Sequence, residues 1–208
     1  MISRFHYLTQ EVAGFSHSEL AEIACKNGVK WVQLRLKNAS YEEWLKTASD
    51  TLEVCKKYKA KLIINDNVEV ALKTGADGVH LGANDMDPKK AREILGAGPI
   101  IGATANTIED LIRLSEIKVD YIGLGPYNYT ATKKTLNPIL GIEGLKKISA
   151  SNIHQIPLIA IGGISPEDVE EILSIGIYGI AASSAINLAE DRAEVINDFL
   201  EKLNIKIK

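Results

Sequence analysis

Residues 26–34 read KNGVKWVQL, and a similar order of features recurs in KTGADGVHL at 73–81, EIKVDYIGL at 116–124 and SIGIYGIAA at 174–182. Each stretch runs from the end of a predicted helix through a short turn into an apolar segment typical of a buried strand. The four stretches lead into the second, fourth, sixth and eighth predicted strands. This internal similarity indicates a fold built from repeated strand–helix units.

The remaining sequence fits around these stretches as alternating strands and helices. We expect strands over 5–8, 29–37, 62–65, 78–81, 100–104, 121–124, 157–161 and 179–182. The helices between them should begin at side chains that accept backbone N–H groups, at Ser18, Ser40, Thr107 and Ser165.

Strict alternation of strand and helix implies parallel strands joined by crossover helices. Eight such units with no Pro/Ser-rich linker predict an α/β protein with a single domain over residues 1–208, a closed (β/α)8 TIM barrel. A length of 208 residues is near the lower limit for that fold. An open doubly wound sheet is the alternative, but no G-x-G-x-x-G motif follows the first strand.

Composition narrows the class of partner. Apolar residues make up 46% and charged residues 25%, as is usual for a globular domain, and the formal charge of −3 argues against nucleic acid as a partner. The first residues, MISRFHYLTQ, lack the apolar core of a signal peptide, and no apolar run is long enough for a membrane span. We therefore expect a cytoplasmic protein with no membrane partner, in which Cys25 and Cys55 are inert core thiols.

The predicted second strand carries polar side chains on one face. In WVQLRLK (31–37) the side chains alternate, so the apolar ones face the helices while Gln33, Arg35 and Lys37 face the barrel axis. A cation buried without a partner costs on the order of several kcal/mol, so both cations should lie at the open mouth and face an anion. An exposed strand edge with alternating surface charges is the other interpretation.

Two carboxylates follow neighbouring predicted strands, Asp66 after the third and Asp85 after the fourth. Together they would suit Mg²⁺, which commonly takes one or two carboxylates with water and a substrate phosphate. Each could instead cap a helix, Asp66 before Val68 and Asp85 or Asp87 before Pro88, and capping explains either one better when it is taken alone. Their joint placement favours the metal site.

Small and hydroxyl-bearing residues lie at the ends of three predicted strands. Thr104 ends the fifth strand, Gly162 and Gly163 follow the seventh, and Ser183 and Ser184 follow the eighth. In a TIM barrel the loops after strands seven and eight form the usual phosphate site, where glycine exposes backbone N–H groups. His80 lies inside the apolar fourth strand and is expected to be a satisfied core histidine.

The longest predicted connection runs from Pro126 to Gly141 and follows neither a helical nor a strand period. A loop of that length in a compact domain is usually functional or disordered. It carries Thr130, Thr132 and Lys133, whose hydroxyl and ammonium groups can hold a phosphate; a solvated surface loop is the alternative. With the strand ends, the chain offers two anion sites, which would suit a diphosphate substrate and a monophosphate substrate.

In order along the chain, VQLRLK, IINDNVEVAL, GADGVHLGANDM, IIGATANT, DYIGLGPYNYTATKK, AIGGI and SSAI resemble the thiamine phosphate synthase family over nearly the whole sequence. The resemblance implies a (β/α)8 barrel that joins hydroxymethylpyrimidine diphosphate to hydroxyethylthiazole phosphate and releases pyrophosphate with Mg²⁺. These small-molecule substrates are the implied partners, and the sequence leaves the oligomeric state open.

The resemblance also implies a role for individual residues. The pyrimidine diphosphate would be held by Gln33, Arg35, Lys37, Asn65, Thr104 and Lys133. The thiazole phosphate would be held by Thr130, Ala131, Thr132, Gly162, Ser183 and Ser184. Asp66 and Asp85 would ligate Mg²⁺, while Arg35, Lys37 and Lys133 would act as catalytic residues on the departing diphosphate. The chain departs from the family pattern at Leu36, Ala83 and Asn106, which affects the expected pyrimidine pocket.

The family's dissociative mechanism needs no protein nucleophile, in agreement with the lack of a Ser/His/Asp or Cys/His constellation in the sequence. A thiazole tautomerase of the same fold is the nearest rival, and its acid–base histidine would lie about where this chain has Asn106. A catalytically silent phosphate-binding barrel is a rival from another class. Retention of Asp66, Asp85, Arg35 and Lys133 favours the synthase.

Overall fold

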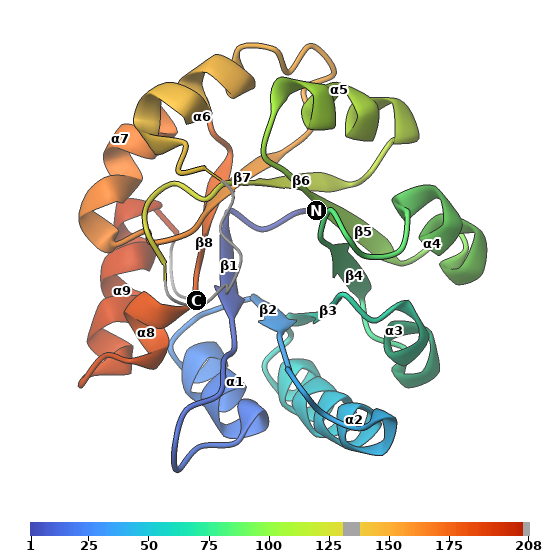
Figure 1. Ribbon diagram of the computed structural model, residues 1–208. Coiled ribbons are helices and arrows are strands. Elements are labelled where there is room, and N and C mark those ends of the chain that lie inside the picture. Colours follow the sequence, from blue (N-terminus) through green and yellow to red (C-terminus); the bar gives the residue numbers. More distant parts are fainter. Residues whose placement is uncertain (131–137, 206–208) are drawn as a thin grey trace.

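Eight parallel strands close into a barrel in the computed structural model, which describes residues 1–130 and 138–205 (Figure 1). The strands are β1 (Phe5–Leu8), β2 (Trp31–Leu34), β3 (Lys61–Asn65), β4 (Gly78–Leu81), β5 (Ile100–Ala105), β6 (Tyr121–Leu124), β7 (Leu158–Ile161) and β8 (Gly179–Ala182). Each strand pairs in parallel with the next, and β8 pairs with β1. The predicted (β/α)8 barrel is confirmed, and the open sheet is excluded.

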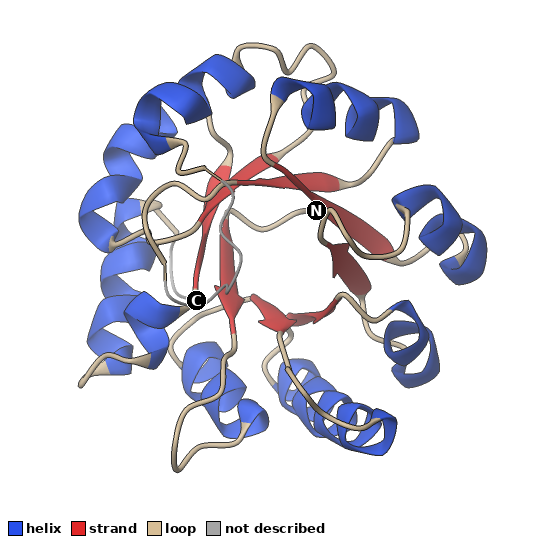
Figure 2. Ribbon diagram, in the orientation of Figure 1, coloured by secondary structure: helices blue, strands red, loops and turns tan. Residues whose placement is uncertain are grey.

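Helices surround the barrel on the outside (Figure 2). They are α1 (His17–Lys26), α2 (Tyr41–Lys57), α3 (Val68–Thr74), α4 (Pro88–Leu95), α5 (Ile108–Ile117), α6 (Gly141–Ser149), α7 (Val169–Ser174), α8 (Ser184–Asn187) and α9 (Arg192–Lys202). A 3₁₀ turn, η1 (Pro166–Asp168), precedes α7. The sequence did not predict α8, because a helix of one turn has no apolar period to detect. Within residues 1–130 and 138–205, no helix has the length and apolar character to cross a membrane.

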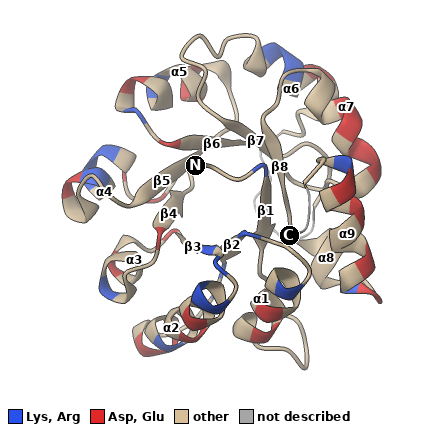
Figure 3. Ribbon diagram, turned by 180° about the vertical axis from the view of Figure 1, so that it is seen from behind, with Lys and Arg blue, Asp and Glu red and all other residues tan. Residues whose placement is uncertain are grey.

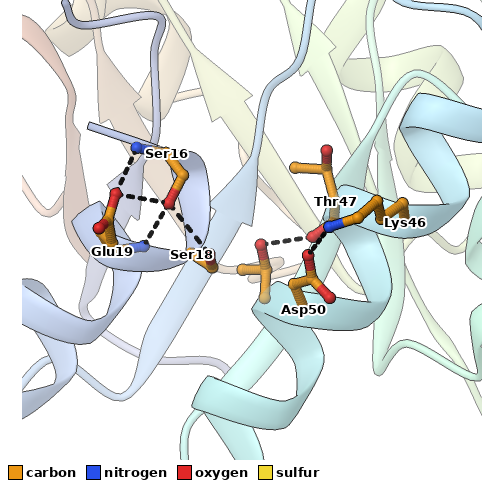
Figure 4. Close-up of polar contacts among 7 residues, drawn as sticks. Ser16, Ser18, Glu19, Lys46, Thr47 and Asp50 are labelled. Carbon is orange, nitrogen blue, oxygen red and sulfur yellow. Dashed lines mark hydrogen bonds and ion pairs between the residues drawn. The ribbon is translucent and has the colours of Figure 1, made fainter. Parts of the chain in front are cut away.

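The first helix begins at a different cap from the one expected. Ser16, not Ser18, is the N-cap of α1: its hydroxyl accepts the Glu19 N–H at 3.2 Å, and its own N–H donates to Glu19 Oε2 at 2.7 Å (Figure 4). This reciprocal pair needs an acidic or amide side chain three residues after the cap. Ser16 has Glu19 there, whereas the third residue after Ser18 is Ala21, which explains the shift.

The second strand is shorter than predicted and ends at Leu34. Beyond it, the Arg35 N–H donates to Thr9 Oγ1 at 3.1 Å and the Lys37 N–H to Glu11 Oε1 at 2.8 Å. Because side chains of the β1–α1 loop take these backbone donors, the chain leaves the sheet before Arg35. The two cations therefore lie on a loop at the mouth of the barrel and not on the strand.

The core has two layers. The larger lies between the strands and the helices, and the smaller fills the barrel interior with Leu8, Trp31, Ile63, Tyr121, Ile159 and Ala181. Most charged residues belong to the outer helices, and acidic residues are frequent on α7 and α9 (Figure 3). Cys25 and Cys55 are buried free thiols, as predicted.

Candidate active site

A cavity of about 430 Å³ opens at the carboxyl ends of the strands, a volume typical of small-molecule sites. Most of the predicted site residues line it: Gln33, Arg35, Asn65, Asp66, Asp85, Thr104, Thr130, Gly162, Ser183 and Ser184. Lys37 is not among the lining residues that the structure describes. Ala131, Thr132 and Lys133 lie outside the described residues. The barrel thus brings the ends of β2–β5 and of β7–β8 to one cavity.

Arg35 supplies positive charge to the wall at the end of β2. Burial lowers the pKa of its guanidinium, while the negative charges of Asp66 and Glu11 raise it. Arginine remains protonated at neutral pH even after such a shift, because its ordinary pKa is so high. The side chain is therefore a permanent cation in a partly dehydrated wall, where an anion would interact with it more strongly than in water.

Gln33 and Asn65 form a fixed amide pair on the neighbouring strands β2 and β3. Gln33 Nε2 donates to Asn65 Oδ1 at 2.7 Å, and both side chains are buried. This bond holds the two amides in one orientation. It directs Gln33 Oε1 and Asn65 Nδ2, an acceptor and a donor, to other partners at the cavity wall.

Neither Asp66 nor Asp85 is a helix cap. The side-chain oxygen of Asn67 accepts a backbone N–H of α3 at 3.0 Å, and that of Asp87 accepts one of α4 at 2.8 Å. The two carboxylates that the sequence could have assigned to capping instead line the cavity. This removes the simplest competing explanation for their joint placement.

A backbone N–H group orients the Asp85 carboxylate, and Asp66 has an unusual backbone conformation. Asp85 Oδ2 accepts the Gly82 N–H at 2.6 Å, which orients that side chain within its own loop. Asp66 has a φ of +66°, a left-handed conformation that is uncommon for a residue other than glycine. Residues held in such conformations cluster at functional sites, where the surrounding structure compensates for the strain.

The carboxylates of Asp66 and Asp85 are the kind of oxygen ligand that a hard cation takes when other ligands come from water or a substrate. The residues that the structure describes contain no group of three or more His, Cys, Asp or Glu side chains able to hold a metal. Two carboxylates on one wall leave most of the coordination of Mg²⁺ to water and phosphate oxygens, which is the usual arrangement for that ion. Asp66 and Asp85 are the described residues that would hold such an ion.

His80 lines the cavity from β4, a placement that the sequence analysis missed. Its ring nitrogens contact Tyr121 Oη and Thr104 Oγ1, each at 3.0 Å, so it is a satisfied histidine as predicted. The period of two along β4 was the available signal. Val79 and Leu81 belong to the outer core layer, which turns His80 toward the axis.

Two glycines lie in the cavity wall at the end of β7, between Ile161 and Ile164. Gly162 and Gly163 have φ values of +101° and +66°. A Cβ on Gly162 would lie 2.8 Å from Pro126 Cα, and one on Gly163 would lie 2.4 Å from the Tyr129 carbonyl oxygen. Only glycine fits at both positions, because Pro126 and Tyr129 pack against the backbone there.

Ser183 lines the cavity after β8, and its hydroxyl is hydrogen-bonded within the protein. Its hydroxyl lies 3.1 Å from both the Leu8 carbonyl oxygen and Gln10 Oε1, two acceptors at the end of β1. Asn187 Nδ2 also donates to the Leu8 carbonyl oxygen, at 2.8 Å. Ser183 and Asn187 therefore fasten the chain after β8 to β1, while Ser184 lines the cavity at the start of α8.

Residues 8–186 match the model of the family described as thiamine monophosphate synthase. The chain belongs to this family. Two thiamine-phosphate synthases are each 44% identical to it. The protein from Bacteroides thetaiotaomicron aligns over 191 residues, which cover 90% of this chain and 91% of that protein. The protein from Flavobacterium psychrophilum aligns over 183 residues, which cover 86% of this chain and 89% of that protein.

A solved structure gives the same family. The thiamine phosphate pyrophosphorylase from Pyrococcus furiosus superposes with a TM-score of 0.86 at 31% identity, covering 97% of this chain and 95% of its own. The resemblance seen in the sequence motifs is thus confirmed for the thiamine monophosphate synthase family as a whole.

Proposed function

We propose that this protein is a thiamine phosphate synthase, which condenses hydroxymethylpyrimidine diphosphate with hydroxyethylthiazole phosphate to give thiamine phosphate and pyrophosphate. One observation carries the proposal. A single cavity combines a wall of charged side chains at β2–β4 with a wall of glycine backbone at β7. Because these strands lie on opposite sides of the barrel, two anionic groups can be held apart with their reacting ends between them (Figure 1).

The diphosphate belongs on the charged wall. Arg35 would contact it directly, Asn65 and Gln33 would bind the pyrimidine beside it, and Thr104 would bind the ring from β5. Asp66 and Asp85 would hold Mg²⁺, which when bound supplies charge neutralisation on the leaving diphosphate. Lys37 and Lys133 enter this part of the proposal through the family resemblance, as further cations for the same group.

The monophosphate belongs on the glycine wall. Backbone N–H groups at 162–163, with Ser184 and the hydroxyl of Thr130, would hold the thiazole phosphate, and Ala131 and Thr132 would join them by the resemblance. The Ser183 hydroxyl is already bonded to the end of β1. We therefore assign Ser183 to shaping this wall and not to donating its hydroxyl to the phosphate.

The reaction requires positioning and charge stabilisation. When the bond to the diphosphate breaks, its electrons leave with pyrophosphate, and a cation remains on the methylene carbon of the pyrimidine. The thiazole nitrogen then attacks that carbon. Arg35 stabilises charge that develops on the leaving group, and the two walls hold the reactants in attack geometry.

A tautomerase function has less support from the cavity. The Asn106 side chain, where that function would have its histidine, donates to the Gly125 carbonyl oxygen and has no proton to exchange at neutral pH. His80, the histidine that lines the cavity, is hydrogen-bonded to Tyr121 and Thr104 through its two nitrogens.

The Mg²⁺ requirement and the cytoplasmic location remain predictions.

The test is a synthesis assay with the purified protein, both substrates and Mg²⁺. We expect thiamine phosphate and pyrophosphate in equal amounts, with no product when either substrate is left out and none when a chelator removes the metal. Absence of product under the complete conditions would contradict the proposal. Isomerisation of a thiazole phosphate without the diphosphate substrate would support the tautomerase instead.

A further inference from the structure

A hydrogen-bonded chain runs from the barrel interior to the cavity wall. Tyr121 Oη lies 3.0 Å from His80 Nδ1, and His80 Nε2 lies 3.0 Å from Thr104 Oγ1. We propose that Tyr121 and His80 are positioning residues that turn the Thr104 hydroxyl into a hydrogen-bond donor toward a ring nitrogen of the bound pyrimidine. This inference rests on the proposed function and extends it to two residues behind the ligand.

The buried Tyr121 end decides which groups donate and which accept in these hydrogen bonds. Tyr121 is 1% exposed, and burial raises the pKa of its phenol, so the group keeps its proton. Among the hydrogen bonds of residues 1–130 and 138–205, the Tyr121 hydroxyl has His80 Nδ1 as its partner. A buried O–H group needs an acceptor. We therefore assign Tyr121 as the donor and Nδ1 as the acceptor.

The tautomer of His80 follows from that assignment. A neutral imidazole carries one N–H, so with Nδ1 accepting, the proton is on Nε2. Nε2 then donates to Thr104 Oγ1, which becomes an acceptor in that bond. The hydroxyl proton of Thr104 is left for another acceptor, and Thr104 lines the cavity.

Glycines on β5 and β6 leave space for the Tyr121 and His80 rings. An added Cβ at Gly102 would lie 2.1 Å from Tyr121 Cζ, and one at Gly123 would lie 3.0 Å from His80 Cε1. Tyr121 also packs edge-on against the rings of His6 and Trp31, with centroid separations of 5.0 and 5.5 Å. Two strand positions without side chains and two ring contacts leave the Tyr121 and His80 rings little freedom to turn.

A fixed donor selects a class of ligand. An aminopyrimidine offers ring nitrogens that accept hydrogen bonds, and it can meet the Thr104 hydroxyl without displacing His80. If the tautomer of His80 were reversed, Nε2 would accept from Thr104, and the wall would offer no proton to the ring. Loss of one neutral hydrogen bond corresponds to about a tenfold change in affinity.

The test is a double-mutant cycle read by calorimetric binding of hydroxymethylpyrimidine diphosphate with Mg²⁺ and without the second substrate. Tyr121→Phe keeps the ring and removes the hydroxyl, and Thr104→Val removes the other end of the chain. We expect each to weaken binding about tenfold and the double variant to be no weaker than Thr104→Val alone. Thr104→Ser keeps a hydroxyl and should recover the affinity that Thr104→Val loses, and binding of the thiazole phosphate should be unchanged throughout.

Tyr178→Phe is the matched control, because the Tyr178 hydroxyl donates to the Ile2 carbonyl oxygen at 2.9 Å. It should leave binding of both substrates unchanged. Two results would overturn the inference by showing that Tyr121 is only structural. One is an affinity loss in the double variant equal to the product of the two single losses. The other is weaker binding of both substrates by Tyr121→Phe. An unmodified protein that binds the diphosphate but makes no product would contradict the proposed function alone, since the cycle can still be measured.

Discussion

The two walls of the cavity use different parts of the chain. At β2–β4, side chains face the cavity and are oriented by hydrogen bonds, such as Gln33 to Asn65 and Gly82 to Asp85. At the end of β7, the wall contains Gly162 and Gly163, and Gly162 has no room for a side chain because Pro126 lies against it. The charged wall should therefore respond to changes of side-chain chemistry, and the glycine wall to changes of shape.

The difference suits the groups that we assign to each wall. A leaving diphosphate gains negative charge during the reaction, so cations that contact it can lower the activation free energy directly. A phosphate that only anchors the second substrate does not change charge, and backbone N–H groups suffice to bind it. Substitutions on the two walls should thus affect different kinetic parameters.

The largest effect is expected from Arg35→Gln. Removing a charge that stabilises the leaving group should lower kcat about a hundredfold to a thousandfold, with little change in binding of the thiazole phosphate. Steady-state kinetics with each substrate varied in turn would measure this. Arg113→Gln is the control, because Arg113 pairs with Asp87 at 3.6 Å, outside the cavity. Equal losses in both variants would contradict the role of Arg35.

A second test concerns the metal. Asp85→Asn keeps an oxygen that can accept the Gly82 N–H but loses the charge, so the Mg²⁺ concentration for half-maximal activity should rise at least about tenfold. A magnesium titration at saturating substrates would measure the shift. Asp87→Asn alters a helix cap in the same loop and should leave the titration unchanged. An unchanged titration for Asp85→Asn would mean that the metal is held elsewhere.

The glycine wall can be tested by shape alone. Gly162→Ala would place a Cβ 2.8 Å from Pro126 Cα at a φ of +101°, so the wall must shift, and the KM for the thiazole phosphate should rise about tenfold. Gly176→Ala is the matched control, since its φ is +84° but nothing lies within 4 Å of the added atom. A rise in KM for the pyrimidine diphosphate instead would mean that the walls are assigned to the wrong substrates.

The smallest effect is expected from Ser183→Ala. Because the hydroxyl is bonded to the end of β1, its loss should cost about 1 kcal/mol of unfolding free energy and change the KM for the thiazole phosphate by less than about threefold. Urea unfolding and steady-state kinetics would measure the two quantities. A large rise in KM with unchanged stability would show that the hydroxyl binds phosphate after all.

The sequence predicted the barrel because strand–helix alternation is a local pattern that each unit repeats. It also predicted that Gln33 faces the axis, since the period of two along β2 is local. It could not decide whether Asp66 and Asp85 were caps, because that depends on which neighbouring oxygen reaches the helix N–H groups. In the structure Asn67 and Asp87 do so.

Contacts between distant parts of the chain were beyond the sequence patterns. Ser183 meets Gln10 only because β8 closes on β1, and Thr104 meets His80 only because β4 and β5 pair in one register. Arg35 leaves the strand early because Thr9, on the preceding loop, takes its backbone N–H. Each of these depends on three-dimensional pairing that no single segment encodes.

The most direct test of the two-wall assignment is a crystal structure with thiamine phosphate, pyrophosphate and Mn²⁺, whose anomalous scattering locates the metal. We expect Mn²⁺ beside Asp66 and Asp85, pyrophosphate next to Arg35, and the phosphate of the product against Gly162. A metal peak away from both carboxylates, or a product phosphate at Arg35 with pyrophosphate at Gly162, would contradict the assignment.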